Sequence, residues 1–272
     1  MKIVVVCEPW RLDPLAWIHR AEARAVAREL RAPLVPYTGE LPPGCALLRL
    51  SDPFMRRVVA ELCTPYRGPG REALERCYDK YEAYRIVSAS GIDSPDTVLA
   101  DSSRLPAVPF VLKPRRGSDS IGVRIASVVP ESKRNSDHLV QARVVGREVT
   151  VALFRDRVGI PLEIRVPPGK PYSFLRKYLL RPRIVPIADE ALRTVARRVG
   201  QLLGVDWAAR VDFIVEAETE RVCFLECDAA PLVGPDSAFA ASLTAAGVDR
   251  RRQLDWLIES PGFLPQPCPR AP

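Results

Sequence analysis

The chain has 272 residues, of which 47% are hydrophobic and 27% are charged. These values are ordinary for a globular protein, and they exclude a largely disordered or low-complexity chain. The length allows one large domain or a few small domains that share a cleft. The apolar runs, such as Ile3 to Cys7, are too short to span a bilayer, and the first residues lack the charged start and cleavable apolar core expected of a signal peptide. We therefore expect a cytoplasmic protein.

Basic residues outnumber acidic residues by 40 to 33, which gives a formal net charge of +7. A basic surface suits nucleic acid, but it also suits a polyanionic small molecule such as a nucleotide, so charge alone does not decide between them. Seven cysteines without a regular spacing indicate reduced thiols. Only Cys223 and Cys227 lie close together, and on a strand they share a face with Leu225, which is typical of core packing rather than of a zinc site.

The first part of the chain alternates between strands and helices. Apolar residues 2–7 predict a buried strand, and residues 14–31 have helical periodicity after Asp13, a suitable N-cap. The alternation continues with two strands and a helix, expected at 33–37, 46–50 and 53–63. This order predicts a small parallel α/β unit over residues 1–72.

The rest of the chain mixes helices with strands, and we expect a central unit over 73–140 and a C-terminal unit over 141–272. Helices are expected at 71–90, 187–203, 238–246 and 249–259. Strands are expected at 107–113, 122–128, 208–216 and 221–227, and as a pair within 138–154 that turns at Val145–Arg147. The connection between the last two strands is short enough for an antiparallel hairpin. A loop rich in proline and basic residues spans 166–183.

The last pair of strands carries the strongest chemical signal. Alternation places Arg210 and Asp212 on one face of the first strand. On the second strand it places Glu226 and Asp228 on one face together with Phe224. Carboxylates then converge beside one arginine, and such hard oxygen ligands suit Mg²⁺ that carries a polyphosphate. The alternative is a solvated strand face.

A second signal is an apolar strand that ends in Lys113 and continues into a loop with Gly117, Ser118, Ser120 and Gly122. This arrangement combines a cation with several free backbone N–H groups, which is the chemistry of a phosphate cradle. The spacing differs from that of a P-loop, and a plain β-hairpin turn is the alternative.

Two further lysines stand out because only six of the 40 basic residues are lysine. Lys80 lies in Asp79-Lys80-Tyr81, and Lys177 lies in Lys177-Tyr178. A compact ammonium group suits a phosphate as a point charge, although chance explains either lysine taken singly.

Taken in order, these segments resemble the ATP-grasp superfamily, and within it the D-alanine–D-alanine ligase-like branch. The segments that carry the resemblance are Asp79–Tyr81 with Gly91–Pro95, Lys113-Pro114 with Ser120–Val123, Gly146–Thr150, Tyr172 with Lys177-Tyr178, and Arg210–Phe213 with Glu226, Asp228 and Ser237. The resemblance implies an α/β fold of three subdomains: a small parallel N-terminal unit, a central α+β lid and a C-terminal α+β domain with an antiparallel sheet. The nucleotide would lie between the second and third subdomains.

The resemblance also implies ATP and two Mg²⁺ ions, or Mn²⁺, as cofactors. Residues implied to bind ATP are Lys80, Lys113, Ser118 and Ser120 at the phosphates, Gln141, Ala142 and Val144 at the adenine, and Glu148 at the ribose. Those implied to hold the metal ions are Asp212, Glu226 and Asp228. Those implied to act on the substrates are Lys177 near the γ-phosphate, Tyr178 at the first substrate, Arg210 at the tetrahedral intermediate, Asp119 at a substrate ammonium and Ser237 at the acyl-acceptor end.

The sequence departs from this branch mainly where amino-acid substrates bind. Cys7–Trp10 replaces the expected Gly-Gly-x-Ser-x-Glu opening, and the usual His-Gly loop is missing. Asp119 replaces a serine, and Leu232 replaces a glycine of the oxyanion hole. Asp228 replaces an asparagine, but it still offers oxygen to a metal ion. We therefore expect an ADP-forming carboxylate–amine ligase that acts through an acyl phosphate on an amino acid or a similar metabolite other than D-alanine.

Two functions of other classes remain open. A catalytically weakened ATP-binding module is suggested by Leu232 and by the missing N-terminal motifs. A nucleic-acid binder is suggested only by the isoelectric point of about 9.2, and no basic motif interleaved with aromatic residues supports it. The expected partners are small-molecule carboxylate and amine substrates, without nucleic acid or membrane. The family resemblance also implies a homodimer, by analogy alone.

Overall fold

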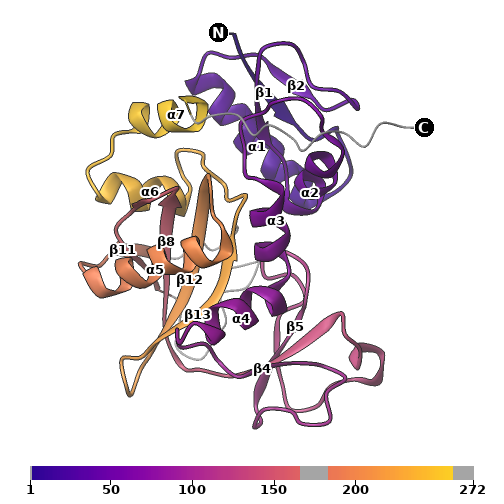
Figure 1. Cartoon of the computed structure of the whole chain (residues 1–272), viewed down its shortest axis with the longest axis vertical. Helices are drawn as coiled ribbons and strands as arrows, with labels where there is room; N and C mark the ends of the chain where they lie inside the picture. Colours follow the sequence, from indigo (N-terminus) through magenta and orange to yellow (C-terminus); the bar gives the residue numbers. More distant parts are fainter. Residues whose placement is uncertain (1, 166–182, 260–272) are drawn as a thin grey trace.

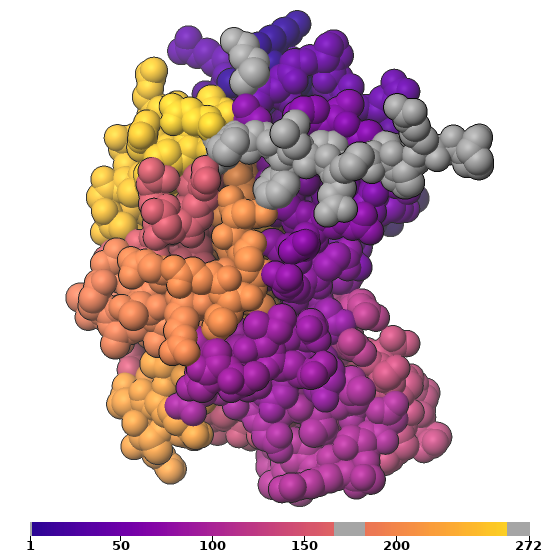
Figure 2. All heavy atoms as spheres, in the orientation of Figure 1, coloured from indigo at the N-terminus to yellow at the C-terminus, as the bar shows by residue number. Residues whose placement is uncertain are grey.

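The computed structural model describes residues 2–165 and 183–259, which form a mixed α/β structure with three sheets (Figure 1). The N-terminal residues lie at one end of an elongated molecule, and the magenta and pink residues around the second sheet form a lobe at the other end (Figure 2). The expected fold class, a parallel unit followed by two units with antiparallel sheets, is confirmed.

The first sheet is parallel and has the strand order β2-β1-β3. Its central strand is a run of valines, and residues buried on both faces are typical of the centre of a parallel sheet. Asp13 caps the first helix as expected, because its Oδ1 accepts a hydrogen bond from the N–H of Leu15 at 3.0 Å. The elements of this unit are β1 (Ile3–Cys7), α1 (Pro14–Glu29), β2 (Leu34–Pro36), β3 (Cys45–Arg49) and α2 (Asp52–Glu61).

The single helix expected at 71–90 is two helices, α3 (Arg71–Tyr78) and α4 (Lys80–Ala89). Asp79 separates them with an extended backbone, and its carboxylate accepts hydrogen bonds from the N–H groups of Tyr81 and Glu82 at 3.1 and 3.2 Å. Aspartate disfavours a helix interior but stabilises an N-terminus in this way. The expectation of one helix is therefore wrong, and Lys80 opens a new helix.

The second sheet is antiparallel, with the order β4-β7-β5-β6. It has a small core of its own, formed by Ala100, Phe110, Leu112, Val129 and Val140. Its first strand has three residues, too few for sequence periodicity to reveal, and we did not expect it. The elements of this part are β4 (Thr97–Leu99), β5 (Phe110–Pro114), β6 (Arg124–Ala126), a 3₁₀ turn (Glu131–Lys133) and β7 (His138–Ala142).

The third sheet has the order β11-β10-β8-β12-β13, with β9 also paired to β8. Its strands are β8 (Gly146–Phe154), β9 (Arg157–Val158), β10 (Leu162–Arg165), β11 (Arg183–Pro186), β12 (Ala208–Glu216) and β13 (Val222–Asp228). The expected hairpin of β12 and β13 is confirmed. The two strands expected within 138–154 also form, but β7 and β8 belong to different sheets, so the chain passes from the lobe to the third sheet between them.

A β-bulge in β13 corrects the expected strand faces. Asp212 pairs with Glu226, but the next residue, Phe213, pairs with Phe224, so Leu225 is an extra residue. The bulge turns Phe224 into the core beside Phe213, with their ring centroids 6.4 Å apart. Phe224 therefore does not share a face with Glu226, because a bulge shifts the alternation by one residue.

The largest core joins the first half of the chain to the third sheet. Leu48 and Met55 of the N-terminal unit belong to the same buried cluster as Phe213 and Phe224 of the β12–β13 pair. Helix α5 (Glu190–Leu203) covers that cluster, while α6 (Ala238–Ala245) and α7 (Arg250–Glu259) pack on a second one that contains Trp207. These shared cores hold the units in fixed positions relative to one another.

The described helices include none that is long and apolar enough to cross a membrane. Cys63 is disulfide-bonded, so the expectation that all thiols are reduced is wrong at that position. Among the cysteines that the structure describes, the free ones are Cys7, Cys45, Cys77, Cys223 and Cys227, and all of them are buried.

Candidate active site

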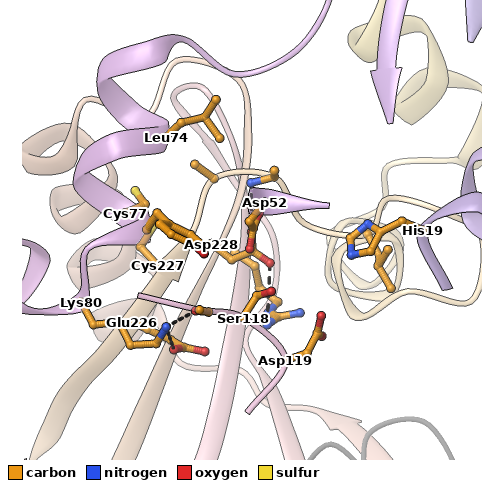
Figure 3. Close-up of a pocket in the computed structure, with 16 residues that line it drawn as sticks. His19, Asp52, Leu74, Cys77, Lys80, Ser118, Asp119, Glu226, Cys227 and Asp228 are labelled. Carbon is orange, nitrogen blue, oxygen red and sulfur yellow. Dashed lines mark hydrogen bonds and ion pairs between the residues drawn. The ribbon is translucent and has the colours of Figure 1, made fainter. Parts of the chain in front are cut away.

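A pocket lies where the three units meet, and its walls come from both halves of the described chain (Figure 3). Helices α1 to α4 contribute one side, the loop after β5 contributes another, and β12, β13 and the segment after β13 complete it. The pocket brings together the following residues that the sequence predicted: Lys80, Ser118, Asp119, Arg210, Glu226 and Asp228.

Paired residues of β12 and β13 supply the charged floor of the pocket. Arg210 lies opposite Asp228, and Asp212 lies opposite Glu226. The guanidinium of Arg210 donates to both carboxylate oxygens of Asp212 at 3.0 Å and lies 4.0 Å from an oxygen of Asp228. Burial alone would lower the pKa of the Arg210 guanidinium, but the negative charges of Asp212 and Asp228 outweigh the effect of burial and raise that pKa. Arg210 is thus a permanent cation held in place by carboxylates.

Asp212 is fixed from a second strand as well. Thr150 lies opposite it on β8, and its hydroxyl donates to Asp212 Oδ1 at 2.6 Å. Asp228 is fixed by the backbone that follows it, because the N–H of Ala230 donates to its Oδ1 at 2.9 Å. The expected convergence of these carboxylates beside an arginine is therefore present, and the strand face is not merely solvated.

Lys80 links the floor to the loop above it. As the first residue of α4, it donates from its ammonium group to the carbonyl oxygen of Gly117, and it lies 3.8 Å from Glu226 Oε2. Asp79 ties the same helix to the loop, because its carboxylate accepts hydrogen bonds from Arg115 at 2.8 Å and from Arg116 at 2.8 Å. Both residues thus position the loop on the N-terminus of α4.

The loop itself has a backbone that turns sharply over the pocket. Asp119 and Ser120 have φ values of 59° and 58°, a region that most side chains avoid and that Asp tolerates. Gly122 has φ 77°, and a Cβ there would approach Pro114 Cγ to 2.9 Å, so only glycine fits. Ser118 and Asp119 line the pocket as a result, while Ser120 is not among its lining residues.

Lys113 lies behind this loop, buried at the end of β5. Its ammonium group donates to Gln141 Oε1 at 3.0 Å, and the amide of Gln141 donates in turn to Thr97 at 2.9 Å. Burial lowers the pKa of Lys113 to about 8, although the charge of Glu226 acts in the opposite direction and that of Lys80 adds to the lowering. Lys113 and Gln141 therefore form a buried polar pair next to the pocket, outside its lining.

The remaining predicted residues lie around this centre rather than in it. Glu148 lies on β8 opposite Ile164 and Ile214. Ser237 caps α6 by accepting from the N–H of Ala240 at 3.1 Å, and it does not line the pocket. Ala142 and Val144 are half-buried where the chain passes from β7 to β8. Tyr172, Lys177 and Tyr178 lie outside the described residues.

Several pocket residues were not expected from the sequence. Cys77 and Cys227 lie in the wall, and the hydrogen bond between the Cys227 thiol and Cys77, together with burial, raises the pKa of Cys227, so Cys227 is not a thiolate nucleophile. His19 and Asp52 come from the N-terminal unit. No local pattern marks these residues, because each reaches the pocket only through the packing of distant elements.

Comparisons with known proteins extend this description. Residues 77–166 match a family described as an ATP-grasp domain. A D-alanine–D-alanine ligase of Acidiphilium cryptum is 27% identical over 230 residues, which are 77% of this chain and 75% of that protein. One of Coprothermobacter proteolyticus is 28% identical over 253 residues, 81% of this chain and 83% of that protein.

Solved structures agree at the level of the fold. The D-alanine–D-alanine ligase of Bacillus anthracis superposes with a TM-score of 0.76 and 20% identity, covering 96% of this chain and 97% of that chain. The VanG D-Ala:D-Ser ligase of Enterococcus faecalis gives a TM-score of 0.75 and 18% identity, covering 95% and 98%. The chain resembles the D-alanine–D-alanine ligase-like branch of the ATP-grasp superfamily over most of its length. The resemblance drawn from its motifs is confirmed.

The carboxylates of β12 and β13 are engaged by side-chain cations. Among residues 2–165 and 183–259, no three Cys, His, Asp or Glu side chains are gathered closely enough to hold a metal ion. Asp212, Glu226 and Asp228 nevertheless offer the hard oxygen donors that Mg²⁺ prefers, on neighbouring strands. The donor chemistry therefore fits Mg²⁺, and the ion would compete with Arg210 and Lys80 for these oxygens.

Proposed function

We propose that this protein is an ADP-forming carboxylate–amine ligase. The observation that carries the proposal is the pocket itself, in which Lys80 and the Gly117–Asp119 loop face Arg210 and the carboxylates Glu226 and Asp228. A lysine and backbone N–H groups suit the phosphates of ATP, and a buried arginine suits the negative charge of an acyl-transfer intermediate. The ATP-dependent ligases among its relatives support this assignment.

The reaction has two steps. An oxygen of the substrate carboxylate attacks the γ-phosphorus of ATP, the bond from that phosphorus to the bridging oxygen breaks, and ADP leaves. An amine then attacks the carbonyl carbon of the acyl phosphate, phosphate leaves, and the amine nitrogen loses a proton. The product is an amide, and the intermediate must be kept from water because water would hydrolyse it.

The residues of the pocket divide these tasks. Lys80 and Lys113 bind the phosphates, and Arg210 stabilises the oxyanion that forms when the amine attacks. Asp212, Glu226 and Asp228 are the residues that would hold Mg²⁺, which supplies positive charge to the phosphates when bound. Ser118 and Ser120 of the loop, Gln141, Ala142 and Val144 near the adenine, and Glu148 at the ribose remain predictions, as do Lys177, Tyr178 and Ser237.

We propose a substrate other than D-alanine for two reasons. Asp119 brings a negative charge into the pocket where the branch usually has a serine. Glu8, in the segment that replaces the usual N-terminal motif, is buried, and its Oε1 accepts a hydrogen bond from the backbone N–H of Ser51 at 2.7 Å. An amino acid or a related metabolite of different shape fits these changes better.

Hydroxylamine provides the test, because it converts any acyl phosphate into a hydroxamate without a specific amine partner. The purified protein is incubated with Mg·ATP, hydroxylamine and single carboxylates, and hydroxamate and ADP are measured. We expect both products in equal amounts with at least one amino acid, and a loss of about 100-fold or more in Asp212→Asn. Asp156→Asn, which changes an exposed aspartate in the turn after β8, is the matched control and keeps full activity.

A catalytically weakened ATP-binding module is the second candidate, favoured by the engagement of both Asp212 oxygens by Arg210. Binding of Mg·ATP without hydroxamate from any carboxylate would support the module and contradict the ligase. Absence of Mg·ATP binding would contradict both proposals.

A further inference from the structure

Cys77 and Cys227 form a pair of thiols in the pocket wall that no role assigned above uses. Cys77 lies near the end of α3, Cys227 lies near the end of β13, and the two thiols share a hydrogen bond. Both side chains are buried, and both belong to the core cluster that joins the first half of the chain to the third sheet. The packing of α3 on β13 thus brings together two sulfur atoms from distant parts of the sequence.

The pair differs from the other free cysteines in its position at the pocket. Cys77 and Cys227 both line the pocket, and Figure 3 shows them next to each other. Cys7, Cys45 and Cys223 are also free and buried, but they do not belong to the pocket lining. A small molecule that enters the pocket therefore meets two adjacent thiols in its wall.

Two thiols in contact are the reduced form of a disulfide, and a peroxide is sufficient to oxidise them. The sulfur of one thiol attacks an oxygen of hydrogen peroxide, the O–O bond breaks, and water leaves, which gives a sulfenic acid. The sulfur of the second thiol then attacks the sulfenic sulfur. The S–S bond forms, the S–O bond breaks, and the second thiol proton leaves with the hydroxyl group as water. The two sulfurs lose two electrons in total, and the peroxide gains them.

A bond between these sulfurs acts on the charged groups of the pocket from two sides. Cys227 lies between Glu226 and Asp228, so the main chain that carries both carboxylates follows any movement of Cys227. Cys77 lies next to the junction at which Lys80 opens α4. An S–S bond is only about 2.05 Å long, so its formation draws the two elements together. Displacement of catalytic groups by about 1 Å is enough to cost about 100-fold in rate.

We propose that Cys77 and Cys227 are a site of reversible oxidation, at which a peroxide forms a disulfide that impairs the pocket. The disulfide does not depend on which reaction the protein catalyses, whereas its effect on activity rests on the ligase function proposed above. In the reduced protein, the two thiols pack as small apolar groups and the pocket keeps the geometry described above. In the oxidised protein, Lys80 is displaced relative to Glu226 and Asp228, and a thiol reductant reverses the change.

Peptide mapping tests the disulfide directly. The purified full chain is treated with hydrogen peroxide, the remaining thiols are blocked with N-ethylmaleimide under denaturing conditions, and the digest is analysed by mass spectrometry. We expect a peptide that links Cys77 to Cys227 and that dithiothreitol separates into two. Absence of the linked peptide from treated protein that is still folded would overturn the proposal.

The effect on the pocket is measured on the same samples. We expect oxidised wild-type protein to bind Mg·ATP about tenfold or more weakly and to form hydroxamate about tenfold or more slowly, and dithiothreitol to restore both. Cys77→Ala and Cys227→Ala are each compared with their own untreated protein, and peroxide should change neither measurement. Either variant is sufficient if the other does not fold.

Cys223→Ala is the matched control, because it removes a buried free thiol from the same strand, outside the pocket lining. It should lose Mg·ATP binding under peroxide as the wild type does. Cys77→Ala keeps the disulfide of Cys63, so an effect of reducing that disulfide is recognised separately.

Two results would contradict the effect on the pocket: an equal loss of Mg·ATP binding in Cys77→Ala and wild type, or a linked peptide without any loss. Absence of hydroxamate from untreated protein that binds Mg·ATP would instead contradict the ligase alone. The linked peptide and the loss of Mg·ATP binding would then still support the oxidation site.

Discussion

Lys113 carries a buried ammonium group that donates a hydrogen bond to Gln141 Oε1 at 3.0 Å. Burial lowers its pKa to about 8, against a usual value of 10.5. The folded protein therefore prefers the neutral amine more than the unfolded chain does. The free energy of unfolding therefore increases as the pH rises from about 8 toward 10.5, because protonation of the buried amine opposes folding.

Binding of ATP should reverse this preference, since phosphates favour the charged ammonium. We expect the affinity for Mg·ATP to fall roughly fivefold between pH 8 and pH 9 as Lys113 loses its proton. Lys113→Met should bind Mg·ATP more weakly and without this pH dependence. Equilibrium dialysis from pH 7 to 9.5 measures both, and the same slope in the wild type and in Lys113→Met would show that another group is responsible.

At the scale of elements, one side chain at the junction between α3 and α4 fixes both the start of α4 and the position of the loop after β5. Asp79 caps α4 and pairs with Arg115 and Arg116 of the loop. Burial alone would raise the pKa of this carboxyl, but the hydrogen bond from Arg115 and the cap outweigh it, and the pKa lies below its usual value of 3.8. The stabilisation is present above that usual value and is lost as the pH falls through the lowered pKa.

Asp79→Ala removes the cap and the ion pairs together. We expect it to lower the free energy of unfolding by about 2–3 kcal/mol at neutral pH and to weaken Mg·ATP binding, because the loop loses its attachment. Urea denaturation at pH 7 and at pH 3 measures the difference between wild type and variant, which should shrink at the lower pH. Asp137→Asn, an exposed position, serves as the control; equal stability of Asp79→Ala and wild type would contradict the role.

Elements with a strong local signal were predictable from the sequence. The valine run of β1, the Asp13 cap of α1 and the short connection of the β12–β13 hairpin each encode their structure within a few residues. The split at Asp79 was missed because the flanking residues continue a helical period, and only the loop arginines make the break favourable. The bulge at Leu225 depends on the pairing with β12, which no periodicity of a single strand contains.

At the scale of the whole molecule, a buried ion pair joins the N-terminal unit to the wall of the pocket. Arg49 is fully buried, pairs with Glu22, and donates to the carbonyl oxygen of Pro231 at 2.6 Å. Glu22 in turn accepts from the N–H of Val233. These bonds hold the segment that follows β13 on both sides of Leu232.

Replacing either residue of this ion pair alone should strongly destabilise the folded protein. We expect Arg49→Met or Glu22→Gln to lower the free energy of unfolding by about 3–5 kcal/mol, because each leaves a buried partner unsatisfied, and the double variant to lose less than the sum. Guanidinium denaturation of the four proteins in a double-mutant cycle gives the coupling. Additive losses would show that the two residues act independently.

The sequence could indicate the phosphate and carboxylate parts of the site, because lysines, glycines and acidic residues cluster locally there. It could not indicate the contribution of α1. His19 and Asp119 are separated by a hundred positions and meet only when the shared core docks the first unit on the others. Sequence periodicity and spacing do not identify residues that are brought together only by such docking.

The attachment around Leu232 uses a backbone carbonyl and a backbone N–H, so it does not depend on which side chain stands between them. The side chain at position 232 can therefore change while the backbone on either side of it stays attached. A library of variants at this one position would alter the contour of the pocket while the main chain keeps its course. Because Leu232 lines the pocket, position 232 offers a starting point for changing which substrates the proposed ligase accepts.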